Sequence, residues 1–408
     1  MKIYLVGGAV RNFLLGLSIT DNDWVVVGAT PDYFLRRKYK KVGKQFPVFL
    51  HPTTNEEYAL ARTEKKSGLG YGGFSVNFSS SITLKEDLYR RDLTINAIAR
   101  DEKNNFLDPF NGRQDLNLRV LRHISPAFSE DPLRILRVAR FLAEFFHMGF
   151  IIAQETFKLI CYMVETKELV YLEPYRIWKE TEKAMKTKNP HVYFMTLQRC
   201  CAVNHLFPEL YMLWNHSFLY YKNFIKDNFF LRNLALISQI SNKIEIRFAS
   251  LFQIQHISLL NNHLIKKDFN NKNYIFILKK FFKRLCFPIY VRNLSLFVFK
   301  YHYFIMNIQY QSSQDILNFF YSIGAWRNPK IINSFCILMK IYLKNFMNYF
   351  ETRNQISIVD IGFLRKSFCI AQSVSISKIL DEGFRGKQIS DELFKRRVYV
   401  LQKWRSKY

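Results

Sequence analysis

Acidic residues are few in this sequence: 33 Asp and Glu stand against 60 Lys and Arg, which gives a formal net charge of +27 over 408 residues. A positive excess of this size favours a polyanionic partner, which is either nucleic acid or an anionic membrane surface. Lys, Asn, Ile, Phe and Tyr are all abundant, so we attribute part of the excess to compositional drift toward A/T-rich codons.

Long hydrophobic runs are missing as well. The apolar stretches at residues 274–278 and 296–299 are short and have Lys or Arg close by, whereas a helix that spans a bilayer needs about 20 apolar residues. Near the start of the chain, Gly7 and Gly8 interrupt the apolar run well before it reaches the length of a secretory h-region. We therefore expect a cytoplasmic protein without a membrane partner.

Cysteines are present but without a metal-binding or redox pattern. The six form no C-x-x-C pair and have no zinc-site spacing, and the sequence contains no internal repeat. The simplest interpretation is a set of reduced thiols in a cytosolic protein.

The apolar patterning divides the chain into two parts. From residue 2 to about residue 125, short β-like runs are separated by clusters of Gly, Pro and Asn. After Ser125 and Pro126, apolar residues recur at helical spacing, and this continues with breaks at prolines 174, 190, 208, 288 and 329. We predict strands at residues 3–6, 24–27, 47–50, 57–62 and 96–99. The fold class expected is α+β, with a mixed-sheet head followed by all-α domains.

Two aspartates, Asp21 and Asp23, stand one residue apart beside the apolar run at residues 24–27. Side chains alternate along a strand, so both carboxylates are expected on one face. Such a pair repels unless a cation lies between them, and Mg²⁺ takes carboxylate oxygens together with substrate phosphates. Because D-x-D also occurs in many surface turns, the pair needs its context to predict a two-metal site for phosphoryl or nucleotidyl transfer.

That context is the glycine pair Gly7-Gly8, which follows the first strand-like run and opens a helix-like segment. Glycines at a helix N-terminus let phosphates approach backbone N–H groups, where the helix dipole favours negative charge. Arg11, one turn further on, is suited to pair with a triphosphate oxygen. The order GG-x-x-R, LLG and D-x-D within the first 23 residues resembles the nucleotidyltransferase superfamily of DNA polymerase beta, and within it the tRNA nucleotidyltransferase/poly(A) polymerase family.

Further segments carry this resemblance. RRDLTINAIA, residues 90–99, is similar to the RRDxxxNA motif of the family, which implies that Arg91 contacts the incoming triphosphate, Asp92 contacts the ribose hydroxyl and Asn96 supports the site. For Arg90, a salt bridge that caps a helix is the alternative interpretation. DPFNGRQDL, residues 108–116, resembles the hinge between head and neck, and residues 62–74 resemble a flexible basic loop rich in Gly and Ser.

The segment EDPLRILRVAR, residues 130–140, places Asp131 and Arg134 three residues apart, which makes them neighbours on a helix. Asp accepts a hydrogen bond from an exocyclic amino group and Arg donates to a ring nitrogen, and cytosine and adenine both present that pattern. Uracil and guanine would leave both charges unpaired at a cost of several kcal/mol. The pair therefore predicts selection of C and A without a nucleic-acid template. A salt-bridged solvent face is the alternative.

This segment resembles the EDxxR motif of class II tRNA nucleotidyltransferases, the bacterial CCA-adding enzymes. The resemblance implies that Glu130 supports the site and that Arg137 and Arg140 also reach the nucleotide. It is dense over the first 180 or so residues and returns at residues 323–329 and 381–393. The domains it implies are a catalytic head (1–125), a nucleotide-selecting neck (126–185), a body (186–222), a degenerate HD-like helical region (223–350) and a tRNA-binding tail (351–408).

The chain departs from the family pattern in two places, and one further position is ambiguous. Relatives with an HD phosphohydrolase domain read RFA-x-L-x-HD, whereas here Gln253 and Ile254 replace the His-Asp pair, and no His-Asp dipeptide occurs in the chain. An amide and an aliphatic group cannot replace metal ligands, so we predict no phosphohydrolase activity and ordinary roles for the histidines His216 and His256.

Asn12 stands where the family usually has Asp, a change that the chemistry should survive. The third carboxylate beside the D-x-D pair is ambiguous, and Glu57, on a candidate strand, is our choice.

Together these features predict a Mg²⁺-dependent enzyme that adds C, C and A to the 3′ end of tRNA from CTP and ATP. Asp21 and Asp23 are the expected catalytic metal ligands. The expected nucleotide-binding residues are Gly8, Arg11, Arg91, Asp92, Asp131, Arg134, Arg137 and Arg140, supported by Gly7, Asn96 and Glu130. The partner expected is tRNA, bound through its acceptor stem and elbow, and we expect a monomer, with a homodimer as the open alternative.

Other readings remain open. One is a poly(A) polymerase or an enzyme that adds only CC or only A, and another is a catalytically silent RNA-binding protein. A poly(A) polymerase typically carries an N-terminal extension and a basic tail, whereas this chain opens directly on the first catalytic strand.

Overall fold

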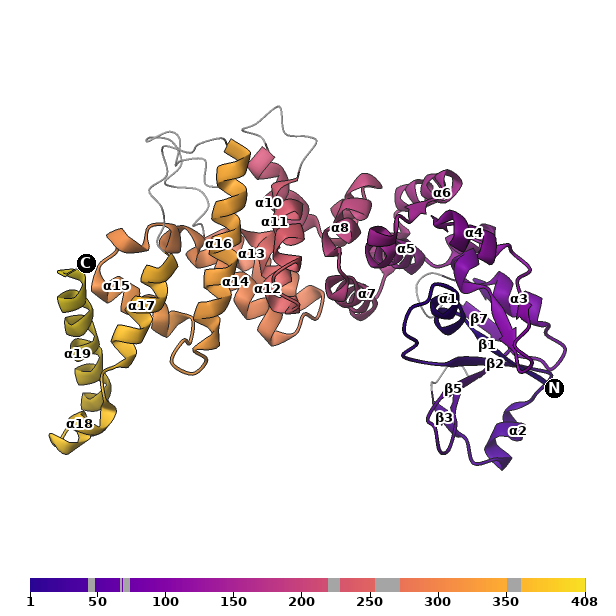
Figure 1. Ribbon diagram of the computed structural model, residues 1–408, viewed down its shortest axis with the longest axis horizontal. Helices are drawn as coiled ribbons and strands as arrows, with labels where there is room; N and C mark the ends of the chain where they lie inside the picture. Colours follow the sequence, from indigo (N-terminus) through magenta and orange to yellow (C-terminus); the bar gives the residue numbers. More distant parts are fainter. Residues whose placement is uncertain are drawn as a thin grey trace. The chain divides into compact units, whose positions relative to one another are not determined.

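The computed structural model describes residues 1–42, 48–66, 68, 74–218, 228–253, 272–350 and 361–407 (Figure 1). The chain divides into two compact units, Met1–Pro208 and Glu209–Tyr408. The finer division into head, neck, body, HD-like region and tail stays a prediction.

The first unit begins with a mixed seven-stranded sheet in the order β3-β4-β5-β2-β1-β8-β9. β1 pairs antiparallel with β2 and with β8, while β2 pairs parallel with β5. The strands are β1 (Lys2–Val6), β2 (Asp23–Val27), β3 (Lys40–Val42), β4 (Val48–Leu50), β5 (Glu57–Leu60), β8 (Ala99–Asp101) and β9 (Phe106–Leu107). The mixed sheet with helices confirms the predicted fold class.

The sheet is covered on both faces, and β2 shows why. Val25 packs into a cluster with Tyr4 and Leu88, while its neighbour Val26 packs into a separate cluster with Phe34 and Phe49. Successive side chains point to opposite faces of a strand, so an unbroken apolar run such as that of β2 serves two cores at once. The strand that begins at Asp23, a predicted metal ligand, is therefore packed on both faces.

Short helices and two-stranded pairs complete the sheet-containing part. They are α1 (Gly8–Leu14), α2 (Pro31–Arg36), α3 (Leu84–Tyr89), the 3₁₀ turn η2 (Thr94–Asn96), α4 (Gly112–Leu118), the pair β6 (Thr63–Lys66) and β7 (Phe74–Asn77), and the pair β10 (Val120–Leu121) and β11 (Ile151–Ile152). The prediction of a strand at residues 96–99 was wrong for all but the last of these residues, because β8 begins at Ala99. Asn96 instead ends a 3₁₀ turn, where its amide makes side-chain hydrogen bonds inside the protein. Of the predicted flexible loop at residues 62–74, residues 63–66 and 74 instead lie in the paired strands β6 and β7, and residues 67 and 69–73 lie outside the described residues.

Helices make up most of the rest of the first unit: η3 (Pro126–Glu130), α5 (Leu133–Phe145), η4 (Phe146–Met148), α6 (Gln154–Glu165), η5 (Glu168–Tyr171), α7 (Pro174–Lys186), α8 (Pro190–Arg199) and α9 (Val203–Leu206). α5 is buried on most sides and packs against α7 and α8. α7 and α8 begin at the prolines predicted as breaks, because proline suits the first helical position, where its missing N–H would have no partner in the helix. α5 and α7 supply many of the charged side chains described below.

The described elements of the second unit are helices joined by short connections. Its elements are α10 (Pro208–Phe218), α11 (Phe229–Ser238), α12 (Ile244–Ala249), η6 (Ser250–Phe252), α13 (Lys272–Arg284), α14 (Ile289–Met306), η8 (Ile308–Tyr310), α15 (Ser313–Ser322), α16 (Lys330–Phe350), α17 (Ile361–Gln372), α18 (Ile376–Asp381) and α19 (Lys387–Arg405). Among the described residues, no helix has the length and apolar character needed to cross a membrane.

Gln253, which replaces the HD histidine, is fully buried, and its side-chain amide donates a hydrogen bond to the Leu338 carbonyl over 3.0 Å. This position is used for packing against α16. Ile254, His256 and the side chain of His216 lie outside the described residues, and the absence of phosphohydrolase activity stays a prediction.

Candidate functional site

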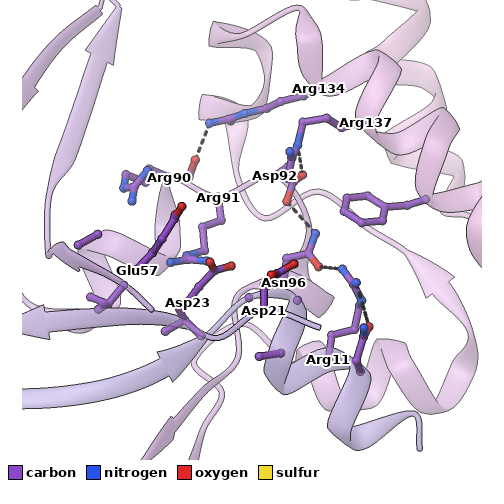
Figure 2. Close-up of a pocket in the computed structure, with 18 of the residues that line it drawn as sticks. Arg11, Asp21, Asp23, Glu57, Arg90, Arg91, Asp92, Asn96, Arg134 and Arg137 are labelled. Atoms are coloured by element: carbon purple, nitrogen blue, oxygen red, sulfur yellow. Dashed lines mark hydrogen bonds and ion pairs between the residues drawn. The ribbon is translucent and has the colours of Figure 1, made fainter. Parts of the chain in front are cut away.

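A pocket of about 730 Å³ opens in the first unit. It is lined by the edge of the sheet, by α1, by the segment that follows α3, and by the helices α5 and α7. The predicted site residues Gly7, Gly8, Arg11, Asp21, Asp23, Glu57, Arg91, Asp92, Asn96, Asp131, Arg134, Arg137 and Arg140 all line it. Figure 2 shows the side chains pointing toward one another from these elements. Glu130, which the structure describes, is not among the residues that line this pocket.

The carboxylate edge of the pocket is formed where β2 begins. β2 starts at Asp23, and Asp21 precedes it, so the expectation that both aspartates lie on one strand was wrong. Both side chains still line the pocket. Asp23 is paired in register with Glu57 on the parallel strand β5, and residues in register point to the same face of a sheet. The structure therefore sets Glu57 beside Asp23 (Figure 2).

This edge of the pocket carries an excess of negative charge. Desolvation by the surrounding protein raises the pKa of Asp23, the nearby Arg91 opposes that change, and Asp21 raises the pKa further. A carboxylate in this condition gains from an added cation. Asp21, Asp23 and Glu57 offer the oxygen donors that suit Mg²⁺, which commonly uses one or two carboxylates together with waters and substrate phosphates. Among the described residues, no group of three or more His, Cys, Asp or Glu side chains, these three included, is arranged to hold a metal ion by itself.

Glu56 fixes the segment that carries the two aspartates, and the sequence analysis missed it. Its carboxylate accepts hydrogen bonds from the Asn22 amide over 2.7 Å and from the Trp24 indole over 3.3 Å. Asn22 lies between the two aspartates, so this contact restrains the chain where no strand pairing does. Glu56 stands next to Glu57 in the sequence, but only the tertiary fold reveals which of the two faces the pocket.

Gly7 allows the first strand and α1 to meet close to the site. Its φ is +69°, a conformation that favours glycine, and a Cβ at this position would lie 3.1 Å from Nη1 of Arg91 and 3.7 Å from Oδ2 of Asp23. Any side chain here would push against two groups of the pocket. The glycine predicted from the motif thus has a steric reason.

Arg90 and Arg91 are both held by Asp87, which the sequence analysis did not single out. The buried Asp87 carboxylate accepts from Arg90 over 2.7 Å and from Arg91 over 3.2 Å. Burial raises its pKa, but the two guanidinium groups outweigh burial and hold the pKa of Asp87 below its usual value. Arg90 caps α3 and also binds Glu64 over 2.6 Å. The helix-capping salt bridge considered for Arg90 is therefore present.

Asp92, Asn96 and Arg11 form a chain of hydrogen bonds across the pocket. Asp92 accepts from the Asn96 amide over 2.9 Å and from Nε of Arg137 over 2.7 Å, and the Asn96 carbonyl accepts from Arg11 over 2.6 Å. Burial raises the pKa of Asp92, but Arg137 and Asn96 outweigh it and hold this pKa well below its usual value. Asp92 is thus fixed in both charge and orientation.

Arg11 is more enclosed than the sequence suggested. Its side chain is buried, and its guanidinium carbon lies 5.0 Å from the ring centres of both Phe141 and Phe145 on α5. Burial lowers its pKa to about 10. Asn12 accepts from Nη2 of Arg11 over 2.9 Å and donates to the Ser18 carbonyl over 3.3 Å. The amide therefore keeps the acceptor that an Asp would offer and adds a donor.

Asp131 and Arg134 both line the pocket, but not as neighbours on a helix. α5 begins at Leu133 with Pro132 as its N-cap, so the expectation that Asp131 is helical was wrong. Asp131 instead accepts from the Leu133 N–H over 3.0 Å and from Arg176 over 2.9 Å. The proline after Asp131 disfavours helical backbone there.

The guanidinium of Arg134 is held by backbone carbonyls. It donates to the Ala127 carbonyl over 2.7 Å and to the carbonyl of Arg90. Its five N–H groups exceed these two bonds, so the side chain is oriented while retaining further donors.

Glu180, on α7, holds the other two arginines of α5. Its buried carboxylate lies 2.6 Å from Nε of Arg140 and 4.0 Å from Nη1 of Arg137. Arg140 also pairs with Glu144 over 3.0 Å. The sequence analysis missed Arg176 and Glu180, although their spacing of four residues on an amphipathic helix was a usable signal.

Comparisons with known proteins identify the family of the chain. The family model for the "Poly A polymerase head domain" matches residues 3–122, and that for the "Probable RNA and SrmB-binding site of polymerase A" matches residues 149–213. The CCA-adding enzyme of Buchnera aphidicola subsp. Baizongia pistaciae is 46% identical to this chain over an alignment 416 residues long, which covers 99% of this chain and 97% of the relative.

Solved structures share the fold. The structure of a CCA-adding enzyme with ATP matches with a TM-score of 0.63 and 22% identity, over 98% of this chain and 86% of the other. That of the Bacillus stearothermophilus CCA-adding enzyme with CTP matches with a TM-score of 0.59 and 22% identity, over 98% and 89%. On the strength of its full-length relatives, the chain belongs to the family of CCA-adding enzymes.

Proposed function

We propose that this chain adds C, C and A to the 3′ end of tRNA from CTP and ATP, by nucleotidyl transfer in the pocket of the first unit. One observation carries the proposal: a single pocket joins a carboxylate edge to a fixed Asp/Arg pair. The carboxylate edge suits the reaction, and the Asp/Arg pair suits the choice of base. The full-length relatives, which are CCA-adding enzymes, support the same activity.

In the transfer, the 3′-oxygen of the tRNA attacks the α-phosphorus of the nucleotide. A new phosphodiester bond forms, the bond to the β-phosphate oxygen breaks, and pyrophosphate leaves. Asp21 and Asp23, with Glu57 as a third donor, would hold Mg²⁺ at this edge. When bound there, Mg²⁺ lowers the pKa of the attacking hydroxyl and neutralises charge on the leaving pyrophosphate.

The remaining side chains bind and orient the nucleotide. Arg91 is anchored by Asp87 and points toward the carboxylate edge, where a triphosphate would lie (Figure 2). Asp92 is kept ionised by Arg137 and is suited to accept from a ribose hydroxyl. Because both are held by protein partners, little side-chain freedom is lost when the nucleotide binds.

Asp131 and Arg134 would select the base. The carboxylate accepts from the exocyclic amino group of C or A, and the guanidinium donates to the adjacent ring nitrogen. Uracil and guanine present a carbonyl and an N–H in those places and leave both charges unpaired. Selection then needs no template strand.

The test is an incorporation assay with the purified full chain, Mg²⁺ and a tRNA transcript that ends at the discriminator base. With all four nucleotides, we expect addition of C, C and A and then a halt, and with CTP alone we expect two C residues. Long A tails from ATP would point instead to a poly(A) polymerase. Addition of only CC or only A would identify a partial enzyme, and no incorporation would contradict the proposal.

A further inference from the structure

We infer that Glu144, near the C-terminal end of α5, is a positioning residue whose carboxylate neutralises Arg11 and Arg140 and so limits how tightly the pocket binds a triphosphate or pyrophosphate. The inference rests on the proposed function, in which arginines of the pocket bind the triphosphate. It concerns the phosphate end of the nucleotide and not the choice of base.

The two carboxylate oxygens of Glu144 reach arginines on two different helices. Oε1 lies 3.9 Å from Nη2 of Arg11 on α1, and Oε2 accepts from Nη1 of Arg140 over 3.0 Å. The side chains of Arg11 and Arg140 are 7% and 9% exposed, whereas that of Glu144 is 34% exposed. All three residues line the pocket. Glu144 is therefore a carboxylate at the pocket surface that compensates two enclosed cations.

Arg11 depends on Glu144 for its counter-charge, because its closer partners are neutral. Its guanidinium donates to the amide oxygen of Asn96 over 2.6 Å (Figure 2) and to that of Asn12 over 2.9 Å. Among the residues that the structure describes, Glu144 is the one carboxylate within 4.0 Å of this guanidinium. Burial lowers the pKa of Arg11, and the charge of Glu144 opposes that change. An enclosed cation is costly to leave without a counter-charge.

The guanidinium of Arg11 is also placed to bind phosphate. A Cβ at Gly8 would lie 3.6 Å from Nη2 of Arg11, so this nitrogen lies beside a glycine that is predicted to bind the nucleotide. Of the five N–H groups of a guanidinium, the hydrogen bonds of Arg11 to Asn12 and Asn96 use three. The others remain for a phosphate oxygen. A triphosphate bound there would share Arg11 with Glu144 and would be repelled by it.

Arg140 is less dependent on Glu144. The buried carboxylate of Glu180 accepts from Nε of Arg140 over 2.6 Å, in addition to the bond from Nη1 to Glu144. Removal of the Glu144 charge would leave Arg140 with an anionic partner, while Arg11 would lose its nearest one. The effect of Glu144 on phosphate binding should therefore act chiefly through Arg11.

Loss of the Glu144 charge should have two opposite effects. The protein loses an ion pair and becomes less stable, while the pocket becomes more positive and binds polyphosphates more tightly. Charges this close to one another near a protein surface interact strongly enough to change an affinity about tenfold. A residue that served packing alone would lower the stability without tightening the binding, so the two roles give different results.

The experiment uses the full chain with Glu144→Gln, Asn12→Asp, the double variant of the two, and the control Glu165→Gln. Asn12→Asp adds a carboxylate at the side chain that already contacts Arg11. Glu165 ends α6, is exposed and is not among the residues that line the pocket. The measurements are the Kd of CTP and of pyrophosphate by calorimetry with Mg²⁺ and without tRNA, the melting temperature, and kcat/KM for CTP and UTP on a tRNA transcript.

We expect Glu144→Gln to melt earlier but to bind CTP and pyrophosphate about tenfold more tightly. Asn12→Asp should weaken both ligands, because it gives Arg11 a second carboxylate, and in the double variant it should restore the wild-type affinity. The CTP/UTP ratio of kcat/KM should stay unchanged in every variant, since the two nucleotides carry the same phosphates. Glu165→Gln should match the wild type throughout.

Unchanged or weaker binding by Glu144→Gln would overturn the inference, as would tight binding that persists in the double variant. If Glu144→Gln does not fold, Asn12→Asp decides alone, and an unchanged affinity in that variant would reject the role of Glu144. A wild-type protein that binds CTP but adds nothing to tRNA would instead contradict the proposed function, and the binding measurements would still test Glu144.

Discussion

At the scale of single residues, two kinds of carboxylate lie in and around the pocket: Asp92 and Asp23 line it, while Asp87 and Glu180 hold arginines that line it. Asp87, Asp92 and Glu180 are buried and paired with arginines, so their charge is already compensated by the protein. Asp23 differs, because its surroundings raise its pKa and one of its neighbours is another carboxylate. Paired carboxylates hold the site together, while the uncompensated one is suited to take a cation.

This difference predicts the effect of Asp21→Ala. The variant removes one oxygen donor from the carboxylate edge, so we expect kcat for CTP addition to fall about 10²–10³-fold or more, as happens when one preorganised electrostatic group is lost. Binding of CTP should persist, because the base and ribose contacts lie elsewhere. Asp32→Ala, which changes an exposed carboxylate on α2, is the matched control. Transfer at the normal rate by the Asp21 variant would contradict the metal assignment.

A second residue-scale prediction concerns pH and Asp92. The pKa of Asp92 is lowered in the folded protein, whereas an unfolded Asp titrates near about 3.9. Its contribution to stability is therefore complete above that value and is lost as the pH falls through the lower, folded pKa. We expect Asp92→Asn to reduce the unfolding free energy at neutral pH by about 1–3 kcal/mol, because Arg137 loses its partner.

The check is to compare melting temperatures of wild type and Asp92→Asn from neutral pH down to about pH 2, a range over which linkage removes part of the contribution. The gap between the two proteins should narrow as the pH falls below about 4. Asp32→Asn serves as the exposed control. A gap that stays constant in acid would mean that the charge of Asp92 does not stabilise the fold.

At the scale of elements, close approach between η2 and α4 fixes the segment that carries Asn96. Gly112, the first residue of α4, has no room for a side chain, because a Cβ there would lie 2.2 Å from the Thr94 carbonyl oxygen. The Asp108 carboxylate accepts from the N–H groups of Gly112 and Arg113 and so fixes the start of α4. Thr94 also donates to Asp115 on α4 over 2.7 Å. The two elements are therefore locked together behind the pocket.

We expect Gly112→Ala to destabilise the protein by about 3 kcal/mol or more, since the clash is with backbone and cannot be relieved by a side-chain rotation. Gly383→Ala is a useful contrast, because its φ is +90° but no atom lies within 4 Å of the added Cβ. Backbone strain alone should cost about 1 kcal/mol there. Melting curves of the two variants measure the difference, and equal losses would refute the steric argument.

Element boundaries show what the sequence could and could not predict. Helix starts at Pro174 and Pro190 were predictable, because proline acts on the local backbone alone. The strand at residues 96–99 was not, because the apolar residues there are buried after a 3₁₀ turn and sheet pairing begins only at Ala99. The placement of Asp131 before α5 followed from Pro132, whose effect on the preceding residue was overlooked.

The membership of the pocket was predictable from motifs, but its internal pairing was not. Motifs indicated which side chains gather, and the pocket contains them with the exception of Glu130. Partners such as Glu56, Asp87, Arg176 and Glu180 belong to no motif considered, and their contacts depend on tertiary packing of segments far apart in the chain. A charged residue acquires such a role only through the neighbour that the fold brings to it.

At the scale of the whole molecule, the net charge of +27 predicts a strong salt dependence of tRNA binding. Cations released from the phosphate backbone make affinity fall with ionic strength, so we expect the Kd for tRNA to rise roughly 10³-fold or more between about 50 and 200 mM salt. The Kd for CTP should change far less. Filter binding over a salt series checks this, and parallel slopes for the two ligands would show that the net charge is not used for RNA.

The position of β2 between two cores has a consequence for amide hydrogen exchange. Val25 and Val26 are buried on opposite faces, and β1 and β5 flank the strand on either side. Backbone amides in such a place exchange with solvent only when the surrounding sheet opens. We therefore expect the amides of β2 to be among the slowest to exchange in their unit, so that local fluctuations that expose loops and helix ends would leave Asp23, the first residue of this strand, in place.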